Sequence, residues 1–179
     1  MKLLPAIATV GGYTMVSRVL GFVRDIMIAA FLGAGMVADA FFVAFKLPNF
    51  LRRLFAEGAF NAGFVPIFSE ILEQDGREAA REFAQSALAV LVVALVLLVG
   101  LFQAFMPWLM YGLAPGFVDW PEKFDLTVQL TRITFPYLLF ISVVSLMGGV
   151  LNSVGRFAAV AATPILLNLC LIGALLGLA

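Results

Sequence analysis

The stretch FAQSALAVLVVALVLLVGLFQAFMPWLM, from Phe83 to Met110, contains no charged residue. A helix that crosses a membrane needs about 20 mostly apolar residues, within a range of roughly 17–25. The stretch therefore predicts a transmembrane helix. It is the cleanest apolar segment of the chain, and the composition of the rest agrees with it.

The whole chain is far more apolar than a soluble domain. Of its 179 residues, 63% are hydrophobic and 12% are charged, and the mean hydropathy is +1.08. A soluble domain is about 45–50% apolar and roughly 25% charged. We therefore expect an integral membrane protein. The chain has no histidine and a single cysteine, Cys170, so the sequence offers no histidine catalyst, no internal disulfide and no metal site.

Four more apolar segments lie on either side of the opening stretch. The predicted spans cover approximately residues 4–32, 38–68, 83–110, 127–153 and 157–179. The predicted fold class is all-α, a polytopic transmembrane helical bundle with about five membrane helices. Because the chain stops inside its fifth apolar segment, we expect it to be truncated and to belong to a larger bundle.

Prolines and glycines interrupt these segments at predictable places. Pro48 is expected to kink the second span, because proline removes a backbone donor and clashes with the preceding turn. Pro136 lies in the fourth span, where ordinary helix packing is the preferred interpretation and a kink is the alternative. Gly76 is expected to break the charged segment Ser69 to Glu82 into two polar helical ends.

The positive charges of the short loops predict the orientation of the chain. Cytoplasmic loops carry an excess of lysine and arginine. With a cytoplasmic N-terminus, that side holds Lys2, Arg77, Arg81 and Arg156. The opposite side then holds Lys123, with Arg132 near the start of the fourth span. The difference favours a cytoplasmic N-terminus.

The first span contains SRVLGFVRD, Ser17 to Asp25, with three charges. Residues four and seven apart share a face of a helix, so Arg18, Gly21 and Asp25 form one stripe. Arg24 lies about 100° further round the helix. The charges therefore gather on one side, as expected if that side faces a cavity or a partner helix.

The second span repeats this pattern within ADAFFVAFKLPNFLRRLFAEGAF. Its polar and charged residues are Asp39, Lys46, Asn49, Arg52, Arg53 and Glu57. Four of them fall near one helix face by their spacing, with the register blurred by Pro48: Asp39, Lys46, Arg53 and Glu57.

Insertion into a membrane makes these charges costly. One Arg, Lys or Asp at the centre of a helix costs roughly 2.5–3.5 kcal/mol, so the charges must face water or each other. Internal ion pairs are one explanation, for example Arg18 with Asp25 or Arg53 with Glu57. Over the two spans, however, the cations exceed the anions by two. A water-filled cavity with this excess suits an anionic substrate, and arginine forks suit phosphate or carboxylate oxygens.

At these residues the chain resembles a known family. SRVLGFVRD, ADAFFVAFKLPNFLRRLFAEGAFNAGFVPIF, LNSVGRFA and TPILLN, in this order, are similar to the MurJ (MviN) family of lipid II flippases. That family belongs to the superfamily of multidrug, oligosaccharidyl-lipid and polysaccharide exporters. Its members are much longer, so the resemblance implies that residues 1–179 are the N-terminal part of the first lobe of a larger transporter. One departure is Val160, where the family pattern suggests a proline.

The resemblance also implies a function and a site. The function is the movement of lipid-linked peptidoglycan precursor, lipid II, across the bacterial inner membrane by alternating access, without a cofactor, catalysis or nucleic acid. The partners are this lipid-linked diphosphate, membrane lipids and the remaining helices of the full-length protein. The residues implied to bind substrate are Ser17, Arg18, Arg24, Asp25, Asp39, Asn49 and Arg52, supported by Lys46, Arg53 and Glu57.

Three other functions compete with this one. Within the superfamily, the chain can belong to an exporter of another lipid-linked oligosaccharide or of a drug. A membrane enzyme acting on polyprenyl phosphates needs an acidic pair for a metal, whereas Asp25 and Asp39 lie in separate spans. A scaffold that recruits partners predicts that neutralising the buried arginines reduces stability and spares transport.

Overall fold

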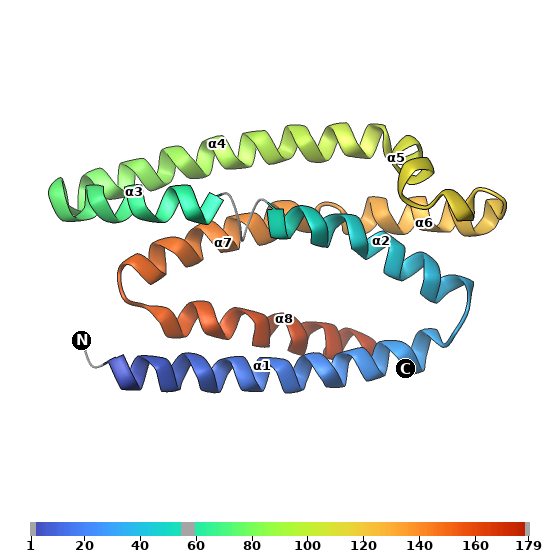
Figure 1. Ribbon diagram of the computed structural model, residues 1–179, viewed down its shortest axis with the longest axis horizontal. Helices are drawn as coiled ribbons and strands as arrows, with labels where there is room; N and C mark the ends of the chain where they lie inside the picture. Colours follow the sequence, from blue (N-terminus) through green and yellow to red (C-terminus); the bar gives the residue numbers. More distant parts are fainter. Residues whose placement is uncertain (1–2, 55–59, 178–179) are drawn as a thin grey trace. The chain divides into compact units, whose positions relative to one another are not determined.

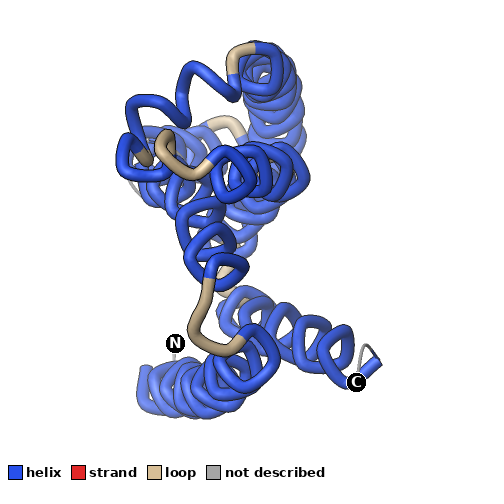
Figure 2. The backbone as a smooth tube through the Cα atoms, turned by 90° about the vertical axis from the view of Figure 1, so that its right-hand side faces the viewer, coloured by secondary structure: helices blue, strands red, loops and turns tan. Residues whose placement is uncertain are grey.

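The computed structural model describes residues 3–54 and 60–177. In this part of the chain all regular structure is helical (Figures 1 and 2). The elements are α1 (Leu3–Leu32), α2 (Met36–Arg52), α3 (Phe60–Gln74), α4 (Gly76–Ala104), α5 (Met106–Leu113), the short 3-10 helix η2 (Pro115–Phe117), α6 (Pro121–Thr134), α7 (Tyr137–Ser153) and α8 (Phe157–Gly177).

The prediction of an all-α membrane helical bundle is confirmed. Within the described residues, three helical stretches are long and apolar enough to cross a membrane: Gly76–Ala104, Pro121–Ser153 and Phe157–Gly177. Helix α1 contains 30 residues, and the second half of its length carries Arg18, Arg24 and Asp25.

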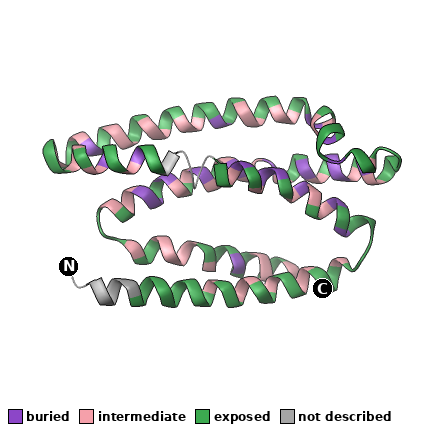
Figure 3. Cartoon of the chain, viewed as in Figure 1, coloured by how far each residue is buried: buried purple, intermediate pink, exposed green. Residues whose placement is uncertain are grey.

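The chain divides into two compact units. The first unit comprises residues 1–34 and 151–179, in which α1 and α8 pack along one another. The second unit comprises residues 35–150, in which α3 packs on α4, while α2 and α5 pack on α6. Buried positions are frequent along α2, α6 and α7, whereas the described side chains of α1 are mostly exposed (Figure 3).

The second predicted span, 38–68, is divided between two helices. Helix α2 ends at Arg52, and α3 begins at Phe60 and continues to Gln74. The residues between them include Glu57, which lies outside the described ranges. The apolar pattern therefore predicted helical structure in both parts of this segment. It did not predict that one helix ends at Arg52 and another begins at Phe60.

Glycine and proline explain the other helix boundaries. Gly76 has φ +88°, a conformation that favours glycine, and separates α3 from α4 at the expected break. The span predicted at 83–110 begins earlier, at Gly76, and is divided at Phe105, two residues before Pro107. The fourth span begins at Pro121 rather than near residue 127 and is divided at Phe135 and Pro136.

Two proline breaks free backbone carbonyls, and a polar side chain of a neighbouring helix lies against each. Proline lacks the N–H that bonds the carbonyl four residues earlier, so Pro136 leaves the carbonyl of Arg132 without its helical donor. Gln103 Nε2 of α4 donates to that oxygen at 2.7 Å. Pro48 has the same effect on Ala44, whose carbonyl oxygen lies 3.4 Å from the Thr134 hydroxyl. That hydroxyl has one hydrogen to donate and lies 3.2 Å from the Thr131 carbonyl of its own helix, so the two carbonyls share it. Of the two kinks, the one at Pro136 is thus held by an unshared donor of another helix.

Replacing Gln103 by leucine is expected to lower the free energy of unfolding by about 0.6–2 kcal/mol, the range for hydrogen bonds between membrane helices. The Arg132 carbonyl then lacks a donor in an apolar setting. Denaturant titration of the purified full-length protein measures the change. Gln85→Leu is the matched control, because Gln85 is an exposed glutamine of the same helix. Equal losses in the two variants would contradict this role of Gln103.

The second unit has a closely packed core around the α6–α7 junction. Met106, Met110, Phe135 and Leu138 are each 0% exposed. The Phe135 ring stacks on Phe102 with centroids 5.1 Å apart and an interplanar angle of 11°. This packing holds α5, α6 and α7 together, with α4 contributing Phe102.

Candidate functional site

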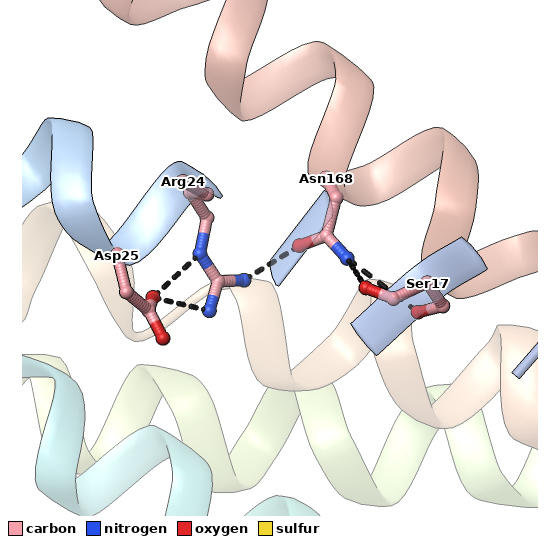
Figure 4. Close-up of polar contacts among 4 residues, drawn as sticks. All are labelled: Ser17, Arg24, Asp25 and Asn168. Carbon is pink, nitrogen blue, oxygen red and sulfur yellow. Dashed lines mark hydrogen bonds and ion pairs between the residues drawn. The ribbon is translucent and has the colours of Figure 1, made fainter. Parts of the chain in front are cut away.

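Arg24 of α1 is bound to its neighbour in the chain, Asp25. Its Nε and Nη2 atoms both donate to Asp25 Oδ1, at 3.0 and 2.7 Å (Figure 4). The Arg24 side chain is 27% exposed, and that of Asp25 is 64% exposed. The carboxylate therefore holds one edge of the guanidinium while remaining largely accessible itself. The sequence left open an ion pair between Arg18 and Asp25. In the structure Asp25 pairs with Arg24 instead.

Asn168 of α8 binds the other branch of the same guanidinium. Arg24 Nη1 donates to Asn168 Oδ1 at 2.8 Å. The amide nitrogen of Asn168 donates to the backbone carbonyl of Ser17 at 3.0 Å and to the Ser17 hydroxyl oxygen at 3.5 Å (Figure 4). Asn168 is 5% exposed. Ser17, Arg24 and Asp25 thus belong to one hydrogen-bonded group that includes a residue of a second helix.

Gly21 allows α8 to approach this face of α1. A Cβ atom built on Gly21 lies 3.7 Å from Asn168 Nδ2, which is ordinary van der Waals contact. Alanine therefore fits at this position, whereas a longer side chain has to displace the Asn168 amide. The glycine of the predicted stripe therefore lies beside Asn168 of the partner helix.

Arg18 lies at a hollow of about 310 Å³ in the same unit. Its polar lining comes from Thr14, Ser17, Arg18 and Asn152, and its apolar lining from Val10, Phe157, Val160, Ala161 and Pro164. Val160, the departure from the family pattern, is thus part of the wall that faces Arg18. The hollow combines one permanent cation with neutral donors and an apolar wall.

A tight turn between α7 and α8 forms one side of this hollow. Gly155 has φ +77°, and its N–H donates to the Asn152 carbonyl at 3.0 Å. The N–H of Arg156 donates to the Leu151 carbonyl at 2.8 Å, as in a glycine-dependent helix C-cap. This turn positions Asn152 and Phe157 at the hollow.

Asp39 of α2 binds Lys123 of α6 in the second unit. Lys123 Nζ lies 2.6 Å from Asp39 Oδ2 and 4.0 Å from the centroid of the Phe117 ring. The Lys123 side chain is 18% exposed and that of Asp39 is 58% exposed. The lysine is therefore held between a carboxylate and an aromatic face, a favourable position for a partly buried cation.

The remaining predicted site residues also lie in the second unit. Lys46 and Arg53 are exposed, while Asn49 and Arg52 are half-buried. Glu57 falls outside the described residues, so the suggested ion pair between Arg53 and Glu57 stays a prediction. Over the described ranges, no three His, Cys, Asp or Glu side chains are grouped to hold a metal ion.

Sequence reasoning missed the two partners that lie far along the chain. Asn168 is the amide residue of the TPILLN motif; it binds α1 through Ser17, as polar residues of membrane helices commonly bind another helix, and it also binds Arg24, which is 144 positions away. Lys123 was counted only for its charge in a loop. A single amide within the apolar segment of α8 was the available signal for Asn168, since polar side chains in membrane helices usually bind another helix.

The apolar helices and the charges on α1 and α2 define a multi-pass membrane protein. The family model described as "Lipid II flippase MurJ" matches residues 28–179. The chain belongs to this family, as the resemblance predicted.

Three relatives show how much of such a protein the chain covers. It is 48% identical to the probable lipid II flippase MurJ of Rhizobium tropici over 176 residues, which are 98% of this chain and 33% of the relative. It is 43% identical to the lipid II flippase MurJ of Burkholderia cenocepacia, over 97% of this chain and 34% of the relative. The corresponding protein of Vibrio cholerae is 42% identical over 96% of this chain and 34% of its own length. The chain spans about a third of the length of these relatives.

Proposed function

We propose that the chain forms the N-terminal part of the first lobe of a lipid II flippase in the bacterial inner membrane, with its N-terminus in the cytoplasm. The full-length protein moves lipid II between leaflets by alternating access, as a transporter that leaves its substrate chemically unchanged. The names of the related proteins support the substrate. The excess of cations in the first two predicted spans supports a negatively charged substrate group.

One observation carries this proposal: an arginine on a helix of a membrane protein is held in a defined orientation by two partners. The three bonds to Asp25 and Asn168 engage three of the five N–H donors that a guanidinium has. An arginine fork matches the geometry of phosphate oxygens and keeps its charge at all relevant pH values. Arg24 is therefore suited to bind the diphosphate of a lipid-linked precursor.

The proposed cycle begins with the diphosphate entering a cavity open to the cytoplasm. There it pairs with Arg24 and Arg18 while the polyprenyl tail remains in lipid. The family resemblance alone assigns Arg52 to this site. Asn49 and Ser17 contribute neutral hydrogen-bonding groups. Rearrangement of the protein then opens the cavity toward the periplasm.

Asp25 has two effects in this mechanism. Its carboxylate orients the guanidinium, and it also competes with the phosphate for the same donors. In a site of low dielectric constant an uncompensated arginine binds an anion strongly, and a transporter has to release its substrate. The mostly exposed carboxylate of Asp25 weakens the complex between Arg24 and the diphosphate enough for the substrate to leave. After release, the carboxylate again binds the Arg24 guanidinium.

Transport by the full-length protein in vesicles tests this proposal. Labelled lipid II is incorporated, and its appearance in the opposite leaflet is followed with and without protein. The expected result is protein-dependent translocation of lipid II. Two further substrates represent the alternative: a polyprenyl diphosphate carrying a different oligosaccharide and an amphipathic drug. Transport of either one without transport of lipid II would overturn the proposed substrate.

A further inference from the structure

Asn168 is a buried polar residue in a strongly apolar helix. Its side chain is 5% exposed, and the segment around it is LLNLCLIGALLG. An amide placed in an apolar environment is costly unless its oxygen and nitrogen find hydrogen-bonding partners. Both ends of the Asn168 amide do so, on two different parts of α1 (Figure 4).

The chemistry of the two partners fixes the direction of the amide. Arg24 can only donate and the carbonyl of Ser17 can only accept. The amide oxygen must therefore face Arg24 and the amide nitrogen must face Ser17, as the distances of 2.8 and 3.0 Å show. A reversed amide would lose both bonds. Asn168 is thus held in one orientation by α1, and it holds the Arg24 guanidinium in turn.

The two partners of Arg24 act on different sides of its guanidinium. Asp25 binds Nε and Nη2 through one oxygen, and it is itself mostly exposed. Asn168 binds Nη1 and is anchored to the backbone of α1 at Ser17. Holding a flexible side chain in its binding orientation reduces the entropy lost when a ligand binds. Of the two partners of Arg24, the buried Asn168 restricts the guanidinium more than the mostly exposed Asp25 does.

We propose that Asn168 is a positioning residue that holds Arg24 in the orientation required for binding the lipid diphosphate. This inference rests on the proposed function. It also predicts that the spacing of α1 and α8 near Gly21 controls the orientation of Arg24, because Asn168 binds Arg24 and Ser17 and its amide lies only 3.7 Å from where a Cβ on Gly21 would be.

Binding of lipid II to the full-length protein in detergent measures the effect. Asn168→Ala is expected to weaken binding about tenfold, the consequence of losing one hydrogen bond to a charged group. Thr163→Ala is the matched control and is expected to bind normally. Thr163 is a half-buried polar residue of the same helix, and its hydroxyl donates to the Ala159 carbonyl within α8 rather than to Arg24 or Ser17.

A double-mutant cycle separates positioning from mere stabilisation. If Asn168 acts through Arg24, Asn168→Ala has no further effect on affinity in an Arg24→Ala background. A purely structural role predicts the same loss of affinity in both backgrounds, together with a lowered midpoint of thermal unfolding, and that result would overturn the inference. If Asn168→Ala does not insert, Asn168→Ser provides the same comparison, because its shorter side chain cannot bridge Arg24 and Ser17.

The outcomes also distinguish this inference from the proposed function. If the wild-type protein does not bind lipid II, the proposed function fails, and the inference fails with it. If the wild type binds and Asn168→Ala binds equally well, the inference alone is refuted.

Discussion

Replacing Arg24 by alanine in the full-length protein is expected to reduce lipid II translocation about a hundredfold. A hydrogen bond to a charged group contributes about 1.5–3 kcal/mol, and the loss of the guanidinium removes at least two such donors from the diphosphate. Each 1.4 kcal/mol corresponds to about a factor of ten in affinity. Initial rates in vesicles, normalised to the amount of inserted protein, measure the change.

Two further variants define what Arg24 supplies. Arg24→Lys keeps the charge but loses the planar fork, so it is expected to retain a rate between those of wild type and Arg24→Ala. Arg156→Ala is the matched control, because Arg156 is an exposed arginine of the α7–α8 turn whose backbone N–H makes the structural contact. Undiminished translocation by correctly inserted Arg24→Ala would refute the role of this arginine in binding the diphosphate.

The largest effect on stability is expected for Phe135→Ala. Phe135 is 0% exposed and stacks on Phe102 at the junction of α6 and α7. Truncating a buried phenylalanine costs about 3–5 kcal/mol, because contacts are lost and a cavity remains. The free energy of unfolding of the full-length protein in detergent measures this loss.

Ile133→Ala provides the control for Phe135→Ala. Ile133 lies two positions earlier, in α6, and is 75% exposed. Its truncation is expected to change stability by less than about 0.5 kcal/mol, as for other exposed positions. Similar values for the two variants would show that the α6–α7 junction is not the packed centre of its unit.

The apolar segments predicted the helices well because membrane helices and apolar runs share one physical cause, the exclusion of polar groups from hydrocarbon. Boundaries were less predictable where a helix continues beyond its apolar part. Helix α6 begins at Pro121, and its first turns contain Glu122 and Lys123, which a search for apolar runs leaves out. Gly76 was located correctly, since its left-handed backbone conformation favours glycine.

The candidate site was predictable only where its contacts are local. Helical spacing placed Arg18, Gly21 and Asp25 on one stripe, and the structure places Gly21 against α8 and Arg18 at a hollow. The partners Asn168 and Lys123 lie 144 and 84 positions from the residues they bind. Such pairs follow from how helices pack, and spacing within a single helix carries no information about them.

The bond between Gln103 and the Arg132 carbonyl makes Pro136 and Gln103 depend on each other. If Pro136 were replaced by a residue with a backbone N–H, the helix could bond Arg132 internally, and the Gln103 amide would become a surplus polar group in an apolar helix. If Gln103 were replaced alone, the proline would leave an unbonded carbonyl. Each change is therefore harmful until the other follows, so related sequences should keep or lose the two residues together.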